Sequence, residues 1–448
     1  MDIINYIGAG LAVGLAGIGV AIGQGFLAKA SVEVIGKRKE MTSFLLTVTI
    51  LGIALVESAA IYGLIVAFQL IGTEAMTLNA AIGAGLAIGL AGAGAGIGEG
   101  ILVAGAIKGI DENPKMKMKL MTFMVLFVAL VESAAIYGLV ISMQILGSAP
   151  FESQSYIGMG LSIGLAALGV AIGHGLLARK TMEAMAQRSE MAGFLLTVTI
   201  LGIALVESAA IYGLVVALSI VGKTLPLYAS IGAGVAIGLT GLGAGIGEGI
   251  LVSGAISAIV RNPSQKTKII TFMVLFVALA EVTAIYGLIV AYGIINIENI
   301  VDSTKFLGAG FAVGLAGLGV AIGIGFLAQE SLKIMGKNPN MIKFLLTISI
   351  LGVALLESAV IYGLVVSFQI LGKETIDGMI AFGSGLAIGL AGLGAGLGEG
   401  LIVKGAMEGM NKAPESKGKT LAFMVLFVAL VEVVAIYGLI IAMQGLYK

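Results

Sequence analysis

The sequence predicts an all-α membrane protein with twelve transmembrane helices, arranged as six tandem antiparallel hairpins. Three observations lead to this fold class. The 448 residues are 59% hydrophobic and only 11% charged, with a mean hydropathy of +1.11, whereas soluble domains carry about 25% charged residues. A unit of about 75 residues recurs six times. Each unit holds two apolar stretches, both long enough to cross about 30 Å of hydrocarbon.

The first stretch of each unit is rich in glycine, as in residues 7–28, and the second is rich in large apolar residues, as in residues 44–71. Glycine at this density indicates closely packed helices. All six prolines lie outside the apolar stretches, so the helices lack the proline breaks that some transporters have. The predicted hairpins are 1–73, 74–149, 150–223, 224–298, 299–373 and 374–448.

A longer repeat overlies the shorter one. The odd hairpins share a segment similar to FLLTVTILGIALVES, and the even hairpins share TFMVLFVAL. The chain is therefore a pair of hairpins present three times, with boundaries near residues 149 and 299. Repeats of this kind stack to bury a continuous surface.

Basic residues predict the topology. Of the 25 lysines and arginines, only Lys223, Lys305, Lys373 and Lys448 lie between hairpins or at the C-terminus. The others flank or occupy the loops inside hairpins, so these loops are expected to be cytoplasmic and both termini to face outside.

The chain contains no cysteine, which excludes disulfides and thiolate metal sites. Its net charge of zero does not indicate a nucleic-acid partner.

One glutamate lies in the middle of each second stretch, and a tyrosine follows it five residues later. Ionisable residues at membrane depth are costly and usually functional. A single one is explained by a hydrogen bond between helices, but six at equal depth point to a repeated ion-handling site. The glutamates are Glu57, Glu132, Glu207, Glu281, Glu357 and Glu432, and the tyrosines are Tyr62, Tyr137, Tyr212, Tyr286, Tyr362 and Tyr437.

A second position, here called the facing position, lies 33 residues before each glutamate. Because the hairpin loop falls halfway between the two, they lie level in the membrane and can share one ion or proton. The facing residues are Gln24, Glu99, His174, Glu248, Ile324 and Glu399.

Hydroxyl groups accompany most of the glutamates. Ser58 follows Glu57 and lies on the same helix face as Tyr62, and we expect the tyrosine hydroxyl to reach back to Glu57. Carboxylate, hydroxyl and amide oxygens suit a hard cation such as Na⁺. Without a cation we expect the glutamate to be protonated, because an isolated buried charge is costly. The other serines are Ser133, Ser208 and Ser358; hairpins 4 and 6 have Val282 and Val433 there, and Thr283 comes one residue late.

The facing positions leave alternatives open. In the even hairpins two carboxylates either share a proton or bind one cation, or Glu99, Glu248 and Glu399 stay protonated and donate hydrogen bonds. In hairpins 4 and 6, which lack the serine, the carboxylate at the facing position would supply another oxygen ligand and so keep cation binding. For His174 a neutral hydrogen-bonding role is favoured over a proton relay. Ile324 removes a ligand, so hairpin 5 is expected to bind Na⁺ weakly or to use protons.

The hairpin resembles the c-subunit, or proteolipid, of rotary ATP synthases and ATPases. The set Gln24, Glu57, Ser58 and Tyr62, at spacings of 33, 1 and 4, is similar to the sodium-binding signature of sodium-driven c-subunits. The resemblance covers the whole chain six times. The glycine-rich helices are similar to those that line the inside of a rotor ring. Loops such as RNP at 261–263 are similar to the loop that meets the central stalk.

The resemblance implies a non-catalytic rotor-ring subunit in a prokaryotic plasma membrane. It would carry Na⁺ or H⁺, without a cofactor, and couple ion flow to ATP synthesis or hydrolysis. Its implied partners are lipid, a stator a-type subunit with an essential arginine, central-stalk subunits and further copies of itself. Inner helices about 9 Å apart give six hairpins a ring radius of about 9 Å and twelve hairpins about 17 Å, so two or more chains per ring are expected. The alternative function is a stand-alone cation channel or secondary transporter built from repeated hairpins.

Overall fold

The computed structural model describes residues 3–298, 300 and 302–447, and its regular structure over these residues is helical. Twelve helical segments within this part of the chain are long and apolar enough to cross a membrane. This confirms the predicted fold class. The predicted hairpin limits at residues 1, 299 and 448 lie outside the described residues.

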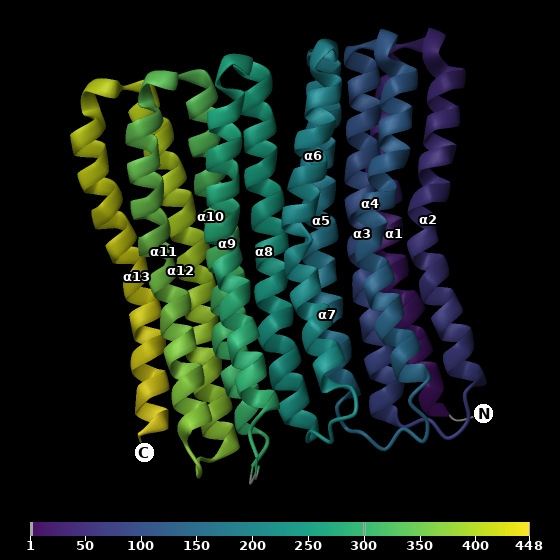
Figure 1. The fold of residues 1–448 in the computed structure, drawn as a ribbon, viewed down its shortest axis with the longest axis vertical. Coiled ribbons are helices and arrows are strands. Elements are labelled where there is room, and N and C mark those ends of the chain that lie inside the picture. Colours follow the sequence, from purple (N-terminus) through teal and green to yellow (C-terminus); the bar gives the residue numbers. More distant parts are fainter. Residues whose placement is uncertain (1–2, 299, 301, 448) are drawn as a thin grey trace.

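The helices pair as six hairpins whose two arms run side by side (Figure 1). They are α1 (Ile3–Lys37) with α2 (Thr42–Gly72), α3 (Leu78–Glu112) with α4 (Lys117–Leu146), α5 (Tyr156–Gln187) with α6 (Ala192–Val206) and α7 (Ser208–Ile220), α8 (Leu227–Arg261) with α9 (Lys266–Ile295), α10 (Lys305–Lys337) with α11 (Ile342–Gly372), and α12 (Gly378–Lys412) with α13 (Lys417–Leu446).

Each hairpin turns through a short 3₁₀ helix, such as Pro114–Met116, in which proline occupies the first position. Proline suits that position because its fixed φ is helical and its missing N–H has no partner to lose. The helices are longer than the apolar stretches: α1 continues to Lys37. These polar ends extend the helices beyond the hydrocarbon layer.

The hairpins form two layers. The first helices of successive hairpins (α1, α3, α5, α8, α10, α12) pack tightly on one another in an inner row. Each second helix before α13 packs on its own first helix and on the first helix of the next hairpin, so it occupies the groove between them. In Figure 1 the hairpin turns lie at one end, and both chain ends lie at the other.

Glycine brings the inner helices into backbone contact. A Cβ on Gly100 of α3 would overlap the backbone of Gly23 in α1. The same holds at the four later copies of this position, which contact the preceding hairpin: Gly175, Gly249, Gly325 and Gly400. Small residues permit this approach in membranes, where dispersion contacts and not the hydrophobic effect hold helices together.

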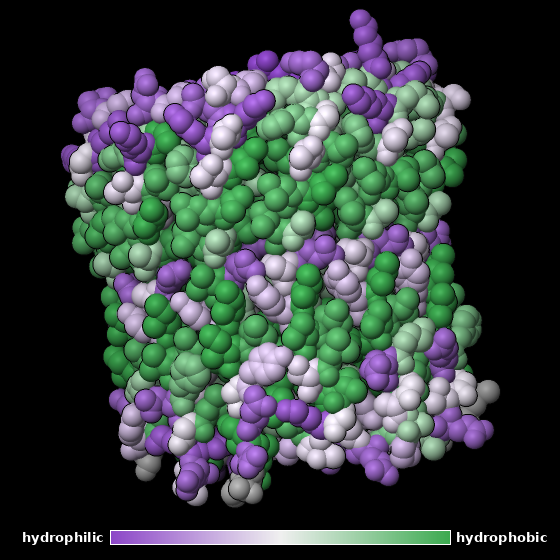
Figure 2. Space-filling model, viewed as in Figure 1, coloured by the Kyte–Doolittle hydropathy of each residue, from purple (hydrophilic) through white to green (hydrophobic). Residues whose placement is uncertain are grey.

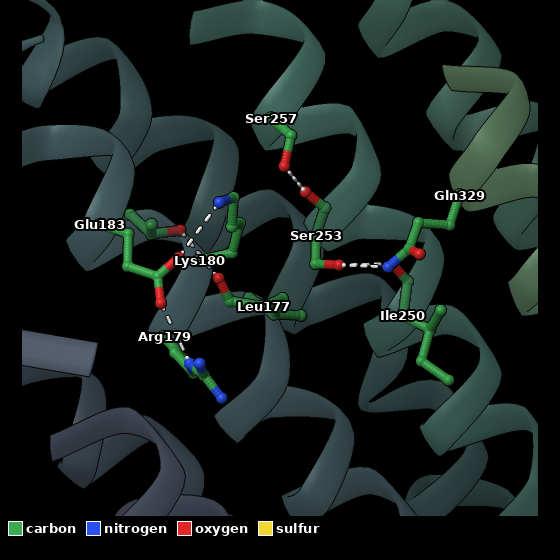
Figure 3. A network of polar contacts seen from close by, with 9 residues as sticks. Leu177, Arg179, Lys180, Glu183, Ile250, Ser253, Ser257 and Gln329 are labelled. Atoms are coloured by element: carbon green, nitrogen blue, oxygen red, sulfur yellow. Dashed lines mark hydrogen bonds and ion pairs between the residues drawn. The ribbon is translucent and has the colours of Figure 1, made fainter. Parts of the chain in front are cut away.

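Polar contacts add to this packing near the hairpin turns. Figure 3 shows Gln329 of α10 donating to Ser253 of α8, at 3.0 Å, and Glu183 of α5 accepting from its own helix neighbours Arg179 and Lys180. At the first turn, Arg38 donates to Asp111 at 2.6 Å. Such contacts tie one hairpin to the next and help to fix their register.

One second helix is interrupted. In hairpin 3 the helix stops at Val206 and resumes at Ser208, with Glu207 between them. The imidazole Nε2 of His174 lies 3.0 Å from the carbonyl oxygen of Ile203, the acceptor of the Glu207 N–H. A side chain that inserts into the helical ladder is a common cause of a local break.

The row of hairpins is open. Within the part of the chain that the structure describes, α1 and α12 share no packing interface. In the apolar windows of α3 and α8, 78% of residues are buried, against 33% in α1 and 44% in α12. The two end helices therefore each leave one face uncovered.

Candidate ion-binding sites

The six glutamates lie midway along the second helices and at a common depth. Figure 2 shows a band of hydrophilic side chains at mid-height across an otherwise apolar face. Glu57 is exposed, whereas the other five glutamates are half-buried. Carboxylates at this depth are reachable from the outer face and partly enclosed by helices.

Four of the six tyrosine hydroxyls reach the glutamate of the next hairpin. At four of the five internal boundaries the hydroxyl donates to a carboxylate oxygen. The pairs are Tyr62 with Glu132 at 2.8 Å, Tyr137 with Glu207 at 2.7 Å, Tyr212 with Glu281 at 2.5 Å, and Tyr362 with Glu432 at 2.8 Å. A site is therefore built from two successive hairpins.

This geometry corrects the expectation that Tyr62 reaches back to Glu57. Five residues along a helix correspond to a rotation of about 140°, so the two side chains point to different neighbours. Ser58 and Tyr62 are separated by only about 40° and share a face. The spacing in the sequence already contained this signal.

The facing residues lie beside the glutamate of their own hairpin. Glu99 interacts electrostatically with Glu132, Glu248 with Glu281, Glu399 with Glu432, and His174 with Glu207. Glu99, Glu248, Glu399 and His174 are fully buried. No cluster of three or more His, Asp or Glu side chains occurs among the described residues, so each site holds at most two acidic groups.

Pairing successive hairpins regroups the predicted residues. The sites with two carboxylates face the serine and tyrosine of hairpins 1, 3 and 5, so each of them keeps a serine on the tyrosine side. These groups are Ser58 and Tyr62 with Glu99 and Glu132; Ser208 and Tyr212 with Glu248 and Glu281; and Ser358 and Tyr362 with Glu399 and Glu432. The three serine hydroxyls donate to carbonyl groups of their own helices, those of Leu55, Leu205 and Leu355, and compensation for a lost serine by the second carboxylate stays a prediction.

The other internal sites differ from these. Glu207 accepts from both Ser133, at 2.9 Å, and Tyr137, with His174 opposite. At Glu357 the partners are missing: in the described residues no hydrogen bond joins it to Tyr286, and Ile324 occupies the facing position.

The residues of hairpin 4 explain why Glu357 lacks these hydrogen-bond partners. Val282 stands where hairpins 1, 2, 3 and 5 have serine, and the Thr283 hydroxyl donates to the carbonyl of Ala280. Gln24, the facing residue of hairpin 1, is half-buried, and Glu57 is exposed.

Unsatisfied polar atoms concentrate at these sites. Among the described residues, nine buried side-chain nitrogen or oxygen atoms have no hydrogen-bond partner, and seven of them belong to facing residues. They are both carboxyl oxygens of Glu99, Glu248 and Glu399, and Nδ1 of His174. Buried polar atoms are nearly always paired, so this concentration makes the facing positions candidates for binding a proton or an ion.

We predict that removing a bonded tyrosine hydroxyl makes its glutamate easier to protonate. In the full chain without sodium, at an alkaline pH where the carboxyl group is largely ionised, Tyr212→Phe should raise the rate of carbodiimide labelling of Glu281 about tenfold, because a hydrogen bond to a charged group is worth about 1.5–3 kcal/mol. Site-resolved mass spectrometry measures the rate. The matched control is Tyr286→Phe, which should leave labelling of Glu357 within about twofold. Equal effects of the two substitutions would contradict the pairing.

Stacked helical hairpins with a mid-depth glutamate on each second helix define a class of membrane proteolipids. The chain belongs to the ATP synthase C-subunit family, whose profile it matches six times, over residues 7–70, 82–145, 157–220, 231–294, 307–370 and 382–444. The resemblance seen in the sequence is thereby confirmed, and the family's members are non-catalytic membrane subunits.

The chain is similar to several named relatives. It is 33% identical to the A-type ATP synthase K-subunit of Methanocaldococcus jannaschii over 218 residues, which cover 48% of this chain and 93% of that protein. It is 46% identical to the ATP synthase c-subunit of Chloroflexus aurantiacus over 57 residues, 13% of this chain and 75% of the relative. It is 43% identical to the ATP synthase c-subunit of Clostridium botulinum over 76 residues, 17% of this chain and 95% of the relative.

Proposed function

We propose that this chain forms the rotor ring of a rotary ATP synthase or ATPase and that its mid-membrane glutamates carry Na⁺ through sites shared by successive hairpins. Family membership supports the rotor assignment. The unpartnered carboxyl oxygens of the facing residues carry the ion-binding part of the proposal, because oxygen ligands without partners in a dry interior need a cation or a proton.

The sites with two carboxylates suit sodium best. Glu99 and Glu132 interact across the site but are not hydrogen-bonded to each other among the described residues. An intervening cation is therefore a better fit than a proton held directly between them. One Na⁺ and one proton neutralise the two carboxylates, so a loaded site would meet the lipid without net charge.

The site of Glu357 is proposed to carry protons. Ile324 supplies no ligand, and no tyrosine hydroxyl in the described chain donates to Glu357. A lone carboxyl group can still take up and release a proton, and desolvation favours its neutral form. His174 gives the Glu207 site a nitrogen in place of an oxygen, which suits Na⁺ less well.

The partners follow from this function. A stator a-type subunit would present an essential arginine to the glutamates on the outer face and displace the ion from each site in turn. Central-stalk subunits would bind the hairpin turns, which the basic residues assign to the cytoplasm of a prokaryote. Ion flow past the stator would then turn the ring and drive ATP synthesis, or ATP hydrolysis would pump ions.

Sodium protection tests this proposal. In the assembled enzyme, carbodiimide reacts with protonated carboxyl groups, and site-resolved mass spectrometry reports each glutamate. Na⁺ is expected to protect Glu132, Glu281 and Glu432 at lower concentrations than Glu357. Glu74, an exposed residue between hairpins, serves as the control, and its reaction should not depend on Na⁺. Failure of Na⁺ at any concentration to protect the two-carboxylate sites would overturn the sodium assignment and leave a proton rotor.

A further inference from the structure

A groove lies between hairpins 3 and 4, at the end of the inner row where the hairpin turns are found. Its volume is about 460 Å³, which is within the range of about 300–1,000 Å³ for ligand pockets. The ends of α5 and α8 and the turn of hairpin 3 line it. Figure 3 shows part of this lining, with Lys180 on α5 and Ser257 on α8. None of the mid-membrane glutamates lines the groove, so it is separate from the ion-binding sites.

The groove is lined by three cationic side chains and, among the described residues, by no carboxylate. The three are Lys180, Arg188 and Arg261. Arg261 makes no ion pair or side-chain hydrogen bond within the described chain. The Arg188 guanidinium lies 3.7 Å from the carboxylate of Glu190, whose side chain is 66% exposed, and exposed ion pairs of this kind are weak. Both guanidinium groups therefore remain available to an anion.

The third cation, Lys180, is only partly neutralised. It donates to Glu183 at 3.1 Å, but the same carboxylate also accepts from Arg179 at 3.1 Å (Figure 3). Lys180 is also repelled by Lys333 of α10. A cleft lined by charges of one sign attracts counter-ions, so this groove favours an anionic ligand.

The other internal boundaries lack this combination of three cations. The aligned positions carry at most one cation at each of them. At the first boundary that cation, Arg38, is bound to Asp111 at 2.6 Å. The neighbouring groove, which also contains Arg261, holds two carboxylates, those of Glu330 and Glu408. The excess of positive charge is therefore particular to the boundary between hairpins 3 and 4 and does not come from the repeat.

The groove lies at the depth of lipid headgroups. Glu248 is at mid-depth, and Arg261 lies about 20 Å further along α8 at 1.5 Å per residue. A bilayer with its headgroups is about 40–45 Å thick, so this distance from the centre reaches the headgroup layer. An anionic group that enters the groove therefore comes from the membrane surface or from the solution beside it.

We propose that this groove is a binding site for a phosphate group, held by Arg188, Arg261 and Lys180. A guanidinium donates two parallel N–H groups to phosphate oxygens, and the lysine ammonium adds a compact positive charge. The phosphate is that of an anionic phospholipid headgroup or a free phosphate ion, and the depth of the groove favours the lipid. Basic pockets between membrane helices bind such headgroups. Binding at this groove does not depend on which ion the glutamates carry.

Native mass spectrometry of the full chain, purified in a neutral detergent, tests the phosphate site. The chain is titrated with phosphatidylglycerol, with phosphatidylcholine, whose headgroup has no net charge, and separately with inorganic phosphate. One phosphatidylglycerol per chain should bind at least about tenfold more tightly than phosphatidylcholine. Binding of one inorganic phosphate without a preference for phosphatidylglycerol would support the site and assign it to the free ion. Binding of neither probe would overturn the phosphate site and leave its cations to an acidic protein segment.

Two substitutions locate the bound phosphate. Arg261→Gln should weaken binding about tenfold, whereas the matched control Lys37→Gln, at the same position of hairpin 1, should change it by less than about twofold. Ser257→Glu places a carboxylate in the groove and should abolish tight binding. The fold should tolerate this change, because Glu183 and Glu408 occupy the same position in their own hairpins, and circular dichroism checks it. Equal effects of Arg261→Gln and Lys37→Gln, or unchanged binding by the Ser257→Glu chain, would overturn the proposal.

Discussion

Glu132→Gln is expected to abolish ion-coupled turnover of the assembled enzyme, by on the order of 100-fold or more. In the proposed rotor, the substituted site would occur in every chain of the ring, and rotation would bring every site to the stator. A glutamine at position 132 is uncharged, so it cannot form an ion pair with a stator arginine or neutralise a bound cation. Sodium-dependent ATP synthesis in proteoliposomes measures the loss.

Two further substitutions serve as comparisons for the loss of turnover in Glu132→Gln. Glu99→Gln keeps one carboxylate and places an amide opposite Glu132, beside Ser58 and Tyr62, so turnover should fall by no more than about tenfold, because amide and hydroxyl oxygens also coordinate sodium. Glu74→Gln, in an exposed linker, should leave turnover unchanged. Full activity of Glu132→Gln would contradict the role of this glutamate.

Gly100→Leu is expected to destabilise the chain by about 3 kcal/mol or more, since overpacking costs about 1–3 kcal/mol and sometimes more. A Cβ at Gly100 already overlaps the backbone of Gly23, and a leucine would force α1 and α3 apart. Unfolding of the purified full chain in mixed detergent, followed by circular dichroism, measures the change.

The control places leucine at Gly25, the glycine of hairpin 1 that is equivalent to Gly100. Gly25→Leu faces open space in the described chain, so the isolated chain should keep its stability to within about 0.5 kcal/mol. Equal destabilisation of the isolated chain by Gly25→Leu and Gly100→Leu would contradict the packing described for the inner row.

The sequence alone predicts the hairpins well, for physical reasons. Crossing about 30 Å of hydrocarbon requires a long apolar helix, and a repeat of about 75 residues leaves room for two helices and a turn. Glycine enrichment correctly marks the helices of the inner row. The level placement of Glu99 and Glu132 follows from their equal distance to the turn.

The assembly of each site was harder to predict. Sequence neighbours such as Glu57 and Tyr62 suggest one local group, although helical rotation directs them to different hairpins. The break at Glu207 depends on where the His174 imidazole finds an acceptor, and no local propensity marks it. The uncovered ends of the row become visible only when the six hairpins are packed.

The central claim is that a tyrosine serves the glutamate of the next hairpin, and one labelling experiment tests it directly. In the assembled enzyme carrying Tyr62→Phe, carbodiimide labelling of Glu132 at an alkaline pH, where the carboxyl group is largely ionised, should rise about tenfold and more Na⁺ should be needed to protect it, while Glu57 reacts as in the unmodified chain. A change at Glu57 with none at Glu132 would contradict the account and return the tyrosine to the glutamate of its own helix.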